Sequence, residues 1–87
     1  RILELNENDN YISIENGFVK EDGPNWYDIA FISVKINDKK IEKWSEKRYF
    51  PKELYNNTPK LIEYFEQNTI TRFEQLSNCI NAIIDEI

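Results

Sequence analysis

The sequence of 87 residues contains no histidine, no methionine and a single cysteine. Histidine is the most frequent general acid–base residue, and structural zinc sites need several cysteine or histidine ligands. The two glycines stand apart, so no glycine-rich loop is present to hold a phosphate group. No run approaches the roughly 18 apolar residues of a membrane-spanning helix, and no signal-peptide pattern is found. These absences predict a protein that is not an enzyme and has no cofactor and no membrane span.

Three features remain as candidates for site chemistry. Residues 6–10, Asn-Glu-Asn-Asp-Asn, carry oxygen ligands but lack the glycine and the distal glutamate of a calcium loop, so we predict a polar turn and no metal. Cys79 lies in the middle of an expected helix, and we interpret it as a small buried apolar residue. Asp28 follows two aromatic residues that could desolvate its carboxylate, but the interpretation we favour has it pointing to water or bonding to the preceding loop.

The charge is distributed in three segments. Residues 1–34 carry a net charge of −5, residues 35–60 of +4 and residues 61–87 of −4, for a total of −5. This surplus of carboxylates argues against nucleic acid as the main partner. The lone cysteine cannot form an internal disulfide, which indicates a reducing compartment, so we predict a cytoplasmic protein.

Residues before Pro51 show the alternation typical of strands. A short strand is expected over 1–5 and another from residue 11. Asn16-Gly17 is typical of a two-residue hairpin turn with a return strand over 18–20, and the alternative is a bulge within one strand over 11–20.

Further strands follow a loop of turn-forming residues at 21–25. Residues 26–36 are apolar on both faces over their first half, which predicts a central strand. A turn at 37–39 leads to a charged return strand over 40–50, which is expected at an edge of the sheet.

After Pro51 the apolar spacing becomes helical. Thr58-Pro59 predicts a cap residue followed by proline at the first helical position, and Thr71 with Glu74 predicts a capping box. The second helix carries one apolar seam, formed by Phe73, Leu76, Ile80, Ile83 and Ile87. We expect a single α+β domain over 1–87, with an antiparallel sheet of three to five strands over about 1–50 and two helices over about 59–87 packed on one face. The alternative for the seam is pairing with another copy.

The basic segment 39–49 has two interpretations. Simple alternation places Lys43, Lys47 and Tyr49 on one face and Trp44 with Arg48 on the other. Lysines interleaved with aromatics are typical of single-stranded nucleic-acid binding. We favour a solvated edge strand, because carboxylates interrupt the second face and the net charge opposes phosphate.

Aromatic residues make up 14% of the chain, more than a core of this size can hide. Trp and Tyr surrounded by charge are frequent anchors of protein interfaces. We therefore predict a protein-binding domain, monomeric or dimeric, whose partner has a basic surface. The expected partner-binding residues are Glu21, Asp22, Trp26, Asp28 and Trp44.

A family resemblance supports this class of function. The stretch N-G-F-V-K-E-D-G-P-N-W-Y-D-I over 16–29, the strands after it and P-K-L-I-E-Y-F over 59–65 resemble the small immunity proteins of bacterial polymorphic toxin systems. The resemblance covers about half of the chain, without a diagnostic motif, and the apolar seam over 73–87 departs from it. It implies tight binding that neutralises one cognate toxin. The alternative is a structural or oligomerisation module of a larger protein or assembly.

Overall fold

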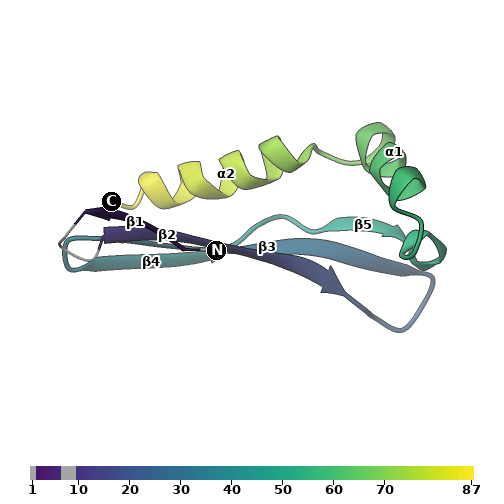
Figure 1. Cartoon of the computed structure of the whole chain (residues 1–87), viewed down its shortest axis with the longest axis horizontal. Coiled ribbons are helices and arrows are strands. Elements are labelled where there is room, and N and C mark those ends of the chain that lie inside the picture. The colour runs from purple at the N-terminus through teal and green to yellow at the C-terminus, as the bar shows by residue number, and fades with distance from the viewer. Residues whose placement is uncertain (1, 7–9) are drawn as a thin grey trace.

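The computed structural model describes residues 2–6 and 10–87. In order, the elements are β1 (Ile2–Asn6), β2 (Asn10–Val19), β3 (Asn25–Ile36), β4 (Lys39–Trp44), β5 (Arg48–Pro51), the 3-10 turn η1 (Lys52–Leu54), α1 (Thr58–Asn68) and α2 (Arg72–Ile84). All strand pairs are antiparallel, in the order β1-β2-β3-β4, and β5 pairs with β3 beyond β4. The α+β class with two terminal helices on the sheet is confirmed (Figure 1). The polar turn predicted at 6–10 includes residues 7–9, which lie outside the described residues.

β2 is one long strand, so the hairpin predicted at Asn16-Gly17 is wrong. Its register with β3 is unbroken from the pair Tyr11–Lys35 to the pair Val19–Tyr27, so it has no bulge there either. The 12-residue β3 offers a partner along the whole of β2, and this long-range pairing overrides the local turn signal. Between β2 and β3 the chain reverses in the predicted loop, where Gly23 adopts a positive φ of 106°.

The predicted edge strand over 40–50 is interrupted by a bulge at residues 45–47. Ser45 holds the bulge against β3, because its backbone N–H donates to the carbonyl of Ala30 at 2.8 Å and its Oγ accepts from the N–H of Ala30 at 2.9 Å. Residues 45–47 therefore oppose only two residues of β3. This one extra residue turns every later side chain of the strand to the opposite face of the sheet.

The phase reversal separates residues that simple alternation places together. Trp44 faces Phe31 before the bulge, and Arg48 faces Asp28 after it. Because positions 28 and 31 of β3 point to opposite faces, Trp44 and Arg48 do so as well. The prediction that these two side chains share a face is wrong.

The helix caps agree with local sequence signals to within one residue. Thr71 and Glu74 form the predicted capping box, with both hydrogen bonds at 3.0 Å. The cap of α1 is Asn57 rather than Thr58, since the Asn57 Oδ1 accepts from the N–H of Lys60 at 3.3 Å. No helix of the described residues is long and apolar enough to cross a membrane.

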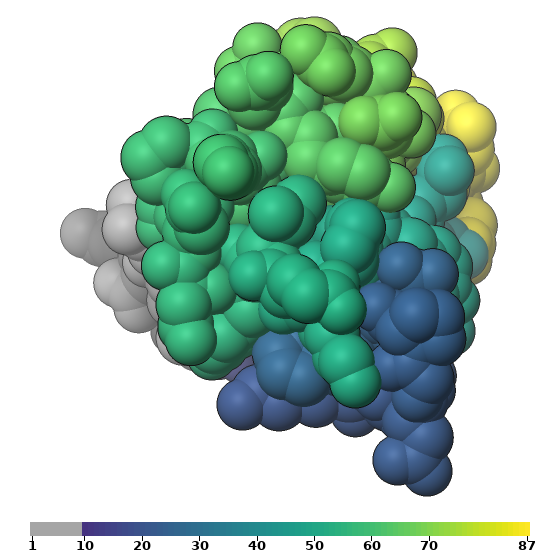
Figure 2. All heavy atoms as spheres, turned by 90° about the vertical axis from the view of Figure 1, so that its right-hand side faces the viewer, coloured from purple at the N-terminus to yellow at the C-terminus, as the bar shows by residue number. Residues whose placement is uncertain are grey.

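Both helices lie end to end on one face of the sheet, and α2 contacts β3 and β4 while α1 contacts β5 (Figure 1). The core beneath them has two apolar clusters. Under α2 the buried members are Ile32, Val34, Cys79 and Ile83, and under α1 they are Phe50, Leu61 and Phe65. The end-on view of Figure 2 shows α1 and the turn before it above the β2–β3 loop.

The apolar seam predicted along the second helix is correct in its middle and wrong at its ends. Phe73 is 79% exposed and Ile87 49% exposed. The buried stripe of α2 runs through Gln75, Cys79 and Ile83 at a spacing of four residues, so Phe73 lies to one side of it. Ile87 lies beyond the end of the helix. The middle of the seam therefore serves as core.

Candidate functional site

The five residues predicted to bind a partner do not form one surface. Glu21 and Asp22 are exposed in the loop between β2 and β3. Trp26 lies on the helix side of the sheet, where its ring meets the edge of Tyr55 at 5.2 Å between centroids. Its Nε1 donates to the carbonyl of Glu21 at 3.1 Å, which anchors the loop. Trp44 lies on the opposite face of the sheet, and Asp28 is buried.

Asp28 is 1% exposed and lies between two arginines. The Arg48 Nε donates to its Oδ2 at 2.8 Å, and the Arg72 Nη2 donates to its Oδ1 at 3.1 Å. The Gln75 Nε2 adds a contact to Oδ2 at 3.3 Å. The favoured interpretation, in which this carboxylate points to water or bonds to the preceding loop, is wrong, because its partners come from β5 and α2. The three charged residues, which we call the buried triad, link β3, β5 and α2 between the two apolar clusters.

The buried triad contains two guanidinium groups and one carboxylate. Arg48 is 5% exposed, stacks on the Phe65 ring at 4.0 Å, and donates from Nη1 to the carbonyl of Ile70 at 3.5 Å. The Arg72 side chain is 39% exposed and also donates to the Gln75 Oε1 at 2.8 Å. The cluster therefore carries one positive charge in excess, and part of it is accessible to water.

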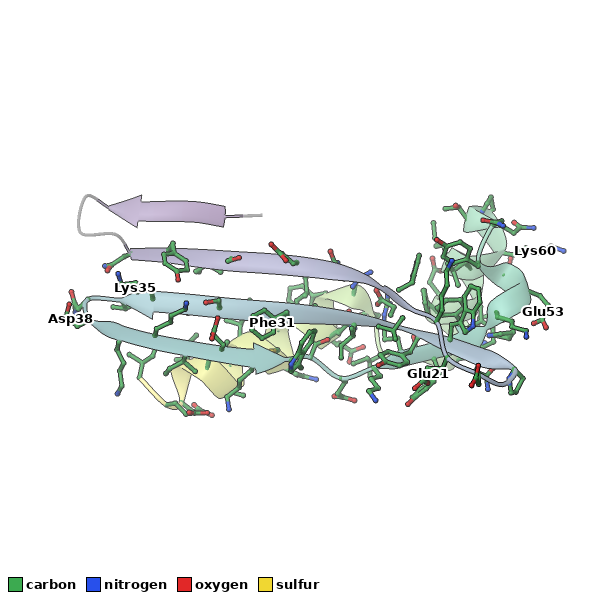
Figure 3. The ribbon with its side chains drawn as sticks, turned by 90° about the horizontal axis from the view of Figure 1, so that it is seen from below. Glu21, Phe31, Lys35, Asp38, Glu53 and Lys60 are labelled. Carbon is green, nitrogen blue, oxygen red and sulfur yellow. The ribbon has the colours of Figure 1, made fainter. Side chains whose placement is uncertain are left out.

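The face of the sheet turned away from the helices, which we call the open face, carries two pairs of aromatic rings. Figure 3 views this face, with Phe31 near its centre. Trp44 is 64% exposed and contacts Phe31 at 4.7 Å between ring centroids. Tyr27 and Tyr49 contact each other at 5.4 Å, and the Lys47 Nζ lies 4.5 Å from the Tyr27 ring. These side chains come from β3, β4 and β5, and the bulge brings Lys47 to the same face.

A shallow hollow of about 300 Å³ adjoins the aromatic rings on the open face. Val19, Ile29, Phe31 and Trp44 are among the residues that line it. Gly17 forms part of the hollow because it has no side chain, and a Cβ atom there would meet no heavy atom within 4 Å. A side chain of another molecule could enter this space next to Trp44.

The charges on the open face are mixed. Strand register places Lys35, Lys40, Glu15 and Glu42 on this face. The Lys40 Nζ lies 3.6 Å from the Glu42 carboxylate, which raises the pKa of this exposed amine. Lys43 points to the other face, where it forms an ion pair with Glu86 at the end of α2. The face predicted to hold Lys43, Lys47 and Tyr49 together therefore does not exist.

Cys79 is buried, as the sequence predicts, and it faces β4 beneath α2. Its Sγ donates a weak hydrogen bond to the Lys43 carbonyl at 3.7 Å. Burial raises the pKa of the thiol, and the nearby Lys43 lowers it by a smaller amount. The described residues contain no group of three acidic, cysteine or histidine side chains that could hold a metal ion.

We expect Cys79 to react slowly with a thiol reagent in the folded protein. Its raised pKa reduces the thiolate fraction and its burial blocks access, so the rate with dithionitrobenzoate at pH 8 should be at least about tenfold below that in urea. Following the absorbance of the released thiolate measures both rates. Equal rates in buffer and in urea would show that the thiol is accessible and would contradict its place in the core.

Comparison of the chain with family models, curated proteins and solved structures gives no match.

Sequence reasoning identified Trp44 but missed its neighbours on the open face, Tyr27, Phe31 and Tyr49. The sequence does predict that Tyr27, Ile29 and Phe31 share one face of the strand, and they alternate with the buried positions of β3. Trp44 pairs with Phe31 before the bulge, whereas the place of Tyr49 opposite Tyr27 depends on the bulge, for which the sequence carries no recognisable signal.

Proposed function

We propose that the chain is a protein-binding domain that captures a partner protein on the open face of its sheet. The observation that carries this proposal is the exposure of Trp44, 64%, beside Phe31 on a face that neither helix covers. Tryptophan and tyrosine surrounded by a polar rim are the residues that most often anchor protein interfaces. The mixed charges around the rings supply such a rim.

An inhibitor of the immunity-protein type is the specific function that we propose. Glu21 and Asp22 remain exposed at one end of the molecule, where they would attract a partner with a basic surface and speed its association. The aromatic rings of the open face would then slow its release. Support for this specific function also comes from the resemblance of 16–29 and 59–65 to immunity proteins.

The first test is co-expression of the tagged chain with the product of the neighbouring gene, followed by light scattering of the eluted complex. A stoichiometric complex that survives moderate salt supports capture of a protein partner. A monomer that leaves that neighbour uncaptured counts against the inhibitor function. An ordered oligomer of this chain alone favours the assembly module. Retention of nucleic acid that is lost steeply with salt favours binding through 39–49.

We expect Trp44→Ser to weaken capture of the partner by about 30-fold or more, since interface hot spots contribute about 2 kcal/mol or more. Phe73→Ser is the matched control, because Phe73 is 79% exposed on α2 and does not belong to the open face. Its affinity should stay within about twofold of the unmodified chain. Titration calorimetry measures both, and thermal melts verify folding. Equal affinity for the two variants would exclude the open face as the docking surface.

A further inference from the structure

A groove lies on the helix side of the sheet, at the junction of α1 and the start of α2. Its volume is about 510 Å³, within the range of sites that bind small organic molecules. The residues that line it are Phe18, Arg48, Tyr55, Thr58, Leu61, Ile62, Phe65, Glu66, Thr71 and Arg72. Most of this lining is apolar, and the groove is on the opposite side of the sheet from the open face.

The apolar lining includes two large side chains that remain partly exposed to water. Phe18 is 42% exposed and Ile62 is 52% exposed, and they come from β2 and α1. α2 covers β3 and β4 but not this end of β2, so the ring of Phe18 is covered only in part, by Phe50 and Tyr55. An apolar molecule in the groove would remove these surfaces from water.

The polar side of the groove is formed by both arginines of the buried triad. They share the single carboxylate of Asp28, so one positive charge lacks a counter-charge within the cluster. Arg48 is almost fully buried, and a buried charge is screened much less than one in water. A ligand carboxylate that reached this end of the groove would supply the missing negative charge through charge-assisted hydrogen bonds.

Glu66 also lines the groove, but it does not neutralise the arginines. Among the described residues, the ion pairs of Arg48 and Arg72 are with Asp28, and Glu66 is exposed. A carboxylate in water at the rim is screened, and it would repel a ligand with several negative charges more than one with a single charge. The charge pattern therefore favours a single anionic group on an apolar body.

We propose that this groove binds a small amphiphilic carboxylic acid, with its apolar body along Phe18, Leu61 and Ile62 and its carboxylate at Arg72. Arg72 is the accessible arginine. Its Nη1 and Nη2 each use one N–H on Gln75 or Asp28, and each has a second N–H that can donate to a ligand carboxylate. The site is separate from the open face, so the chain could hold such a ligand and a protein partner at the same time.

The test is an NMR titration of the unmodified protein with octanoate and, separately, with 1-octanol. The two probes share an apolar chain and differ in charge. We expect octanoate to bind saturably and at least about tenfold more tightly than octanol, since a charge-assisted hydrogen bond contributes about this much. Shifts should concentrate on the amides of 61–72 and on the Nε resonances of Arg48 and Arg72. Equal binding of both probes, or shifts confined to the open face, would overturn the proposal.

A charge variant locates the carboxylate. Arg72→Gln leaves Arg48 paired with Asp28, so the triad becomes balanced, and octanoate affinity should fall at least about tenfold with octanol affinity unchanged. Lys60→Gln is the matched control, because Lys60 is an exposed base of α1 outside the groove lining. Its octanoate affinity should stay within about twofold. An Arg72→Gln protein that keeps full octanoate affinity would show that Arg72 does not hold the carboxylate and would overturn the proposal.

Discussion

Replacing Asp28 with asparagine is expected to lower the free energy of unfolding by about 3–5 kcal/mol. The change keeps the size of the side chain and removes the one carboxylate that both arginines share. Arg48 then stays buried with no counter-charge, and desolvation of an unpaired guanidinium is costly. The total free energy of unfolding of a small domain is about 5–15 kcal/mol, so a substantial fraction of the variant should be unfolded at 37 °C. Urea titration followed by circular dichroism measures the loss.

The control for Asp28→Asn is Asp38→Asn, because Asp38 is exposed in the turn between β3 and β4. The same chemical change there should alter the unfolding free energy by no more than about 0.5 kcal/mol. Arg72→Gln combined with Asp28→Asn should recover part of the loss, since one of the two unpaired charges is then removed. A loss below about 1 kcal/mol for Asp28→Asn would mean that water solvates Arg48 and that the triad is not a buried charge cluster.

The sequence predicted those parts of the fold that depend on neighbouring residues. The capping box of Thr71 and Glu74 is set by contacts three residues apart, and the structure forms both of its hydrogen bonds. The apolar residues on both faces of 26–36 predicted a central strand, and β3 pairs with β2 on one side and with β4 and β5 on the other. Both signals succeeded because the long-range pairing of the chain agrees with them.

The turn signal of Asn16-Gly17 failed because a longer-range interaction opposed it. Both residues pair with β3, opposite Ala30 and Ile29, and these pairs belong to a ladder that continues on either side. A two-residue turn there would have required a return strand of only three residues. Pairing with a long central strand forms more hydrogen bonds than that short hairpin.

The candidate site was harder to predict than the fold. Asp28 and Arg72 are 44 residues apart in the chain, and nothing in the sequence between them indicates that α2 begins over β3. The bulge at 45–47 decides which aromatic residues join Trp44 on the open face. A shift of one residue moves a whole set of side chains to the other face of the sheet. The faces predicted by simple alternation are therefore wrong after the bulge, although the bounds of these strands were nearly correct.

The second large loss of stability is expected from a substitution in the aromatic cluster under α1. Phe50 is fully buried, and its ring contacts Phe18 at 5.3 Å and Phe65 at 5.6 Å, both in edge-to-face geometry. We expect Phe50→Ala to lower the free energy of unfolding by about 3–5 kcal/mol, from lost burial and from the cavity that remains. Because Phe18 and Phe65 line the groove, the variant should also weaken octanoate and octanol binding together.

Phe73→Ala tests whether burial causes this loss. The substitution is the same, but Phe73 is 79% exposed on α2, so its unfolding free energy should change by no more than about 0.5 kcal/mol. Chemical denaturation of both variants gives the comparison, and their m-values verify that each unfolds in one transition. A similar loss of unfolding free energy for the two variants would show that Phe73 is packed against other residues. It would contradict the buried stripe through Gln75, Cys79 and Ile83. A loss confined to Phe50→Ala would establish that the α1 end of the molecule has its own tightly packed core, on which the groove depends for its shape.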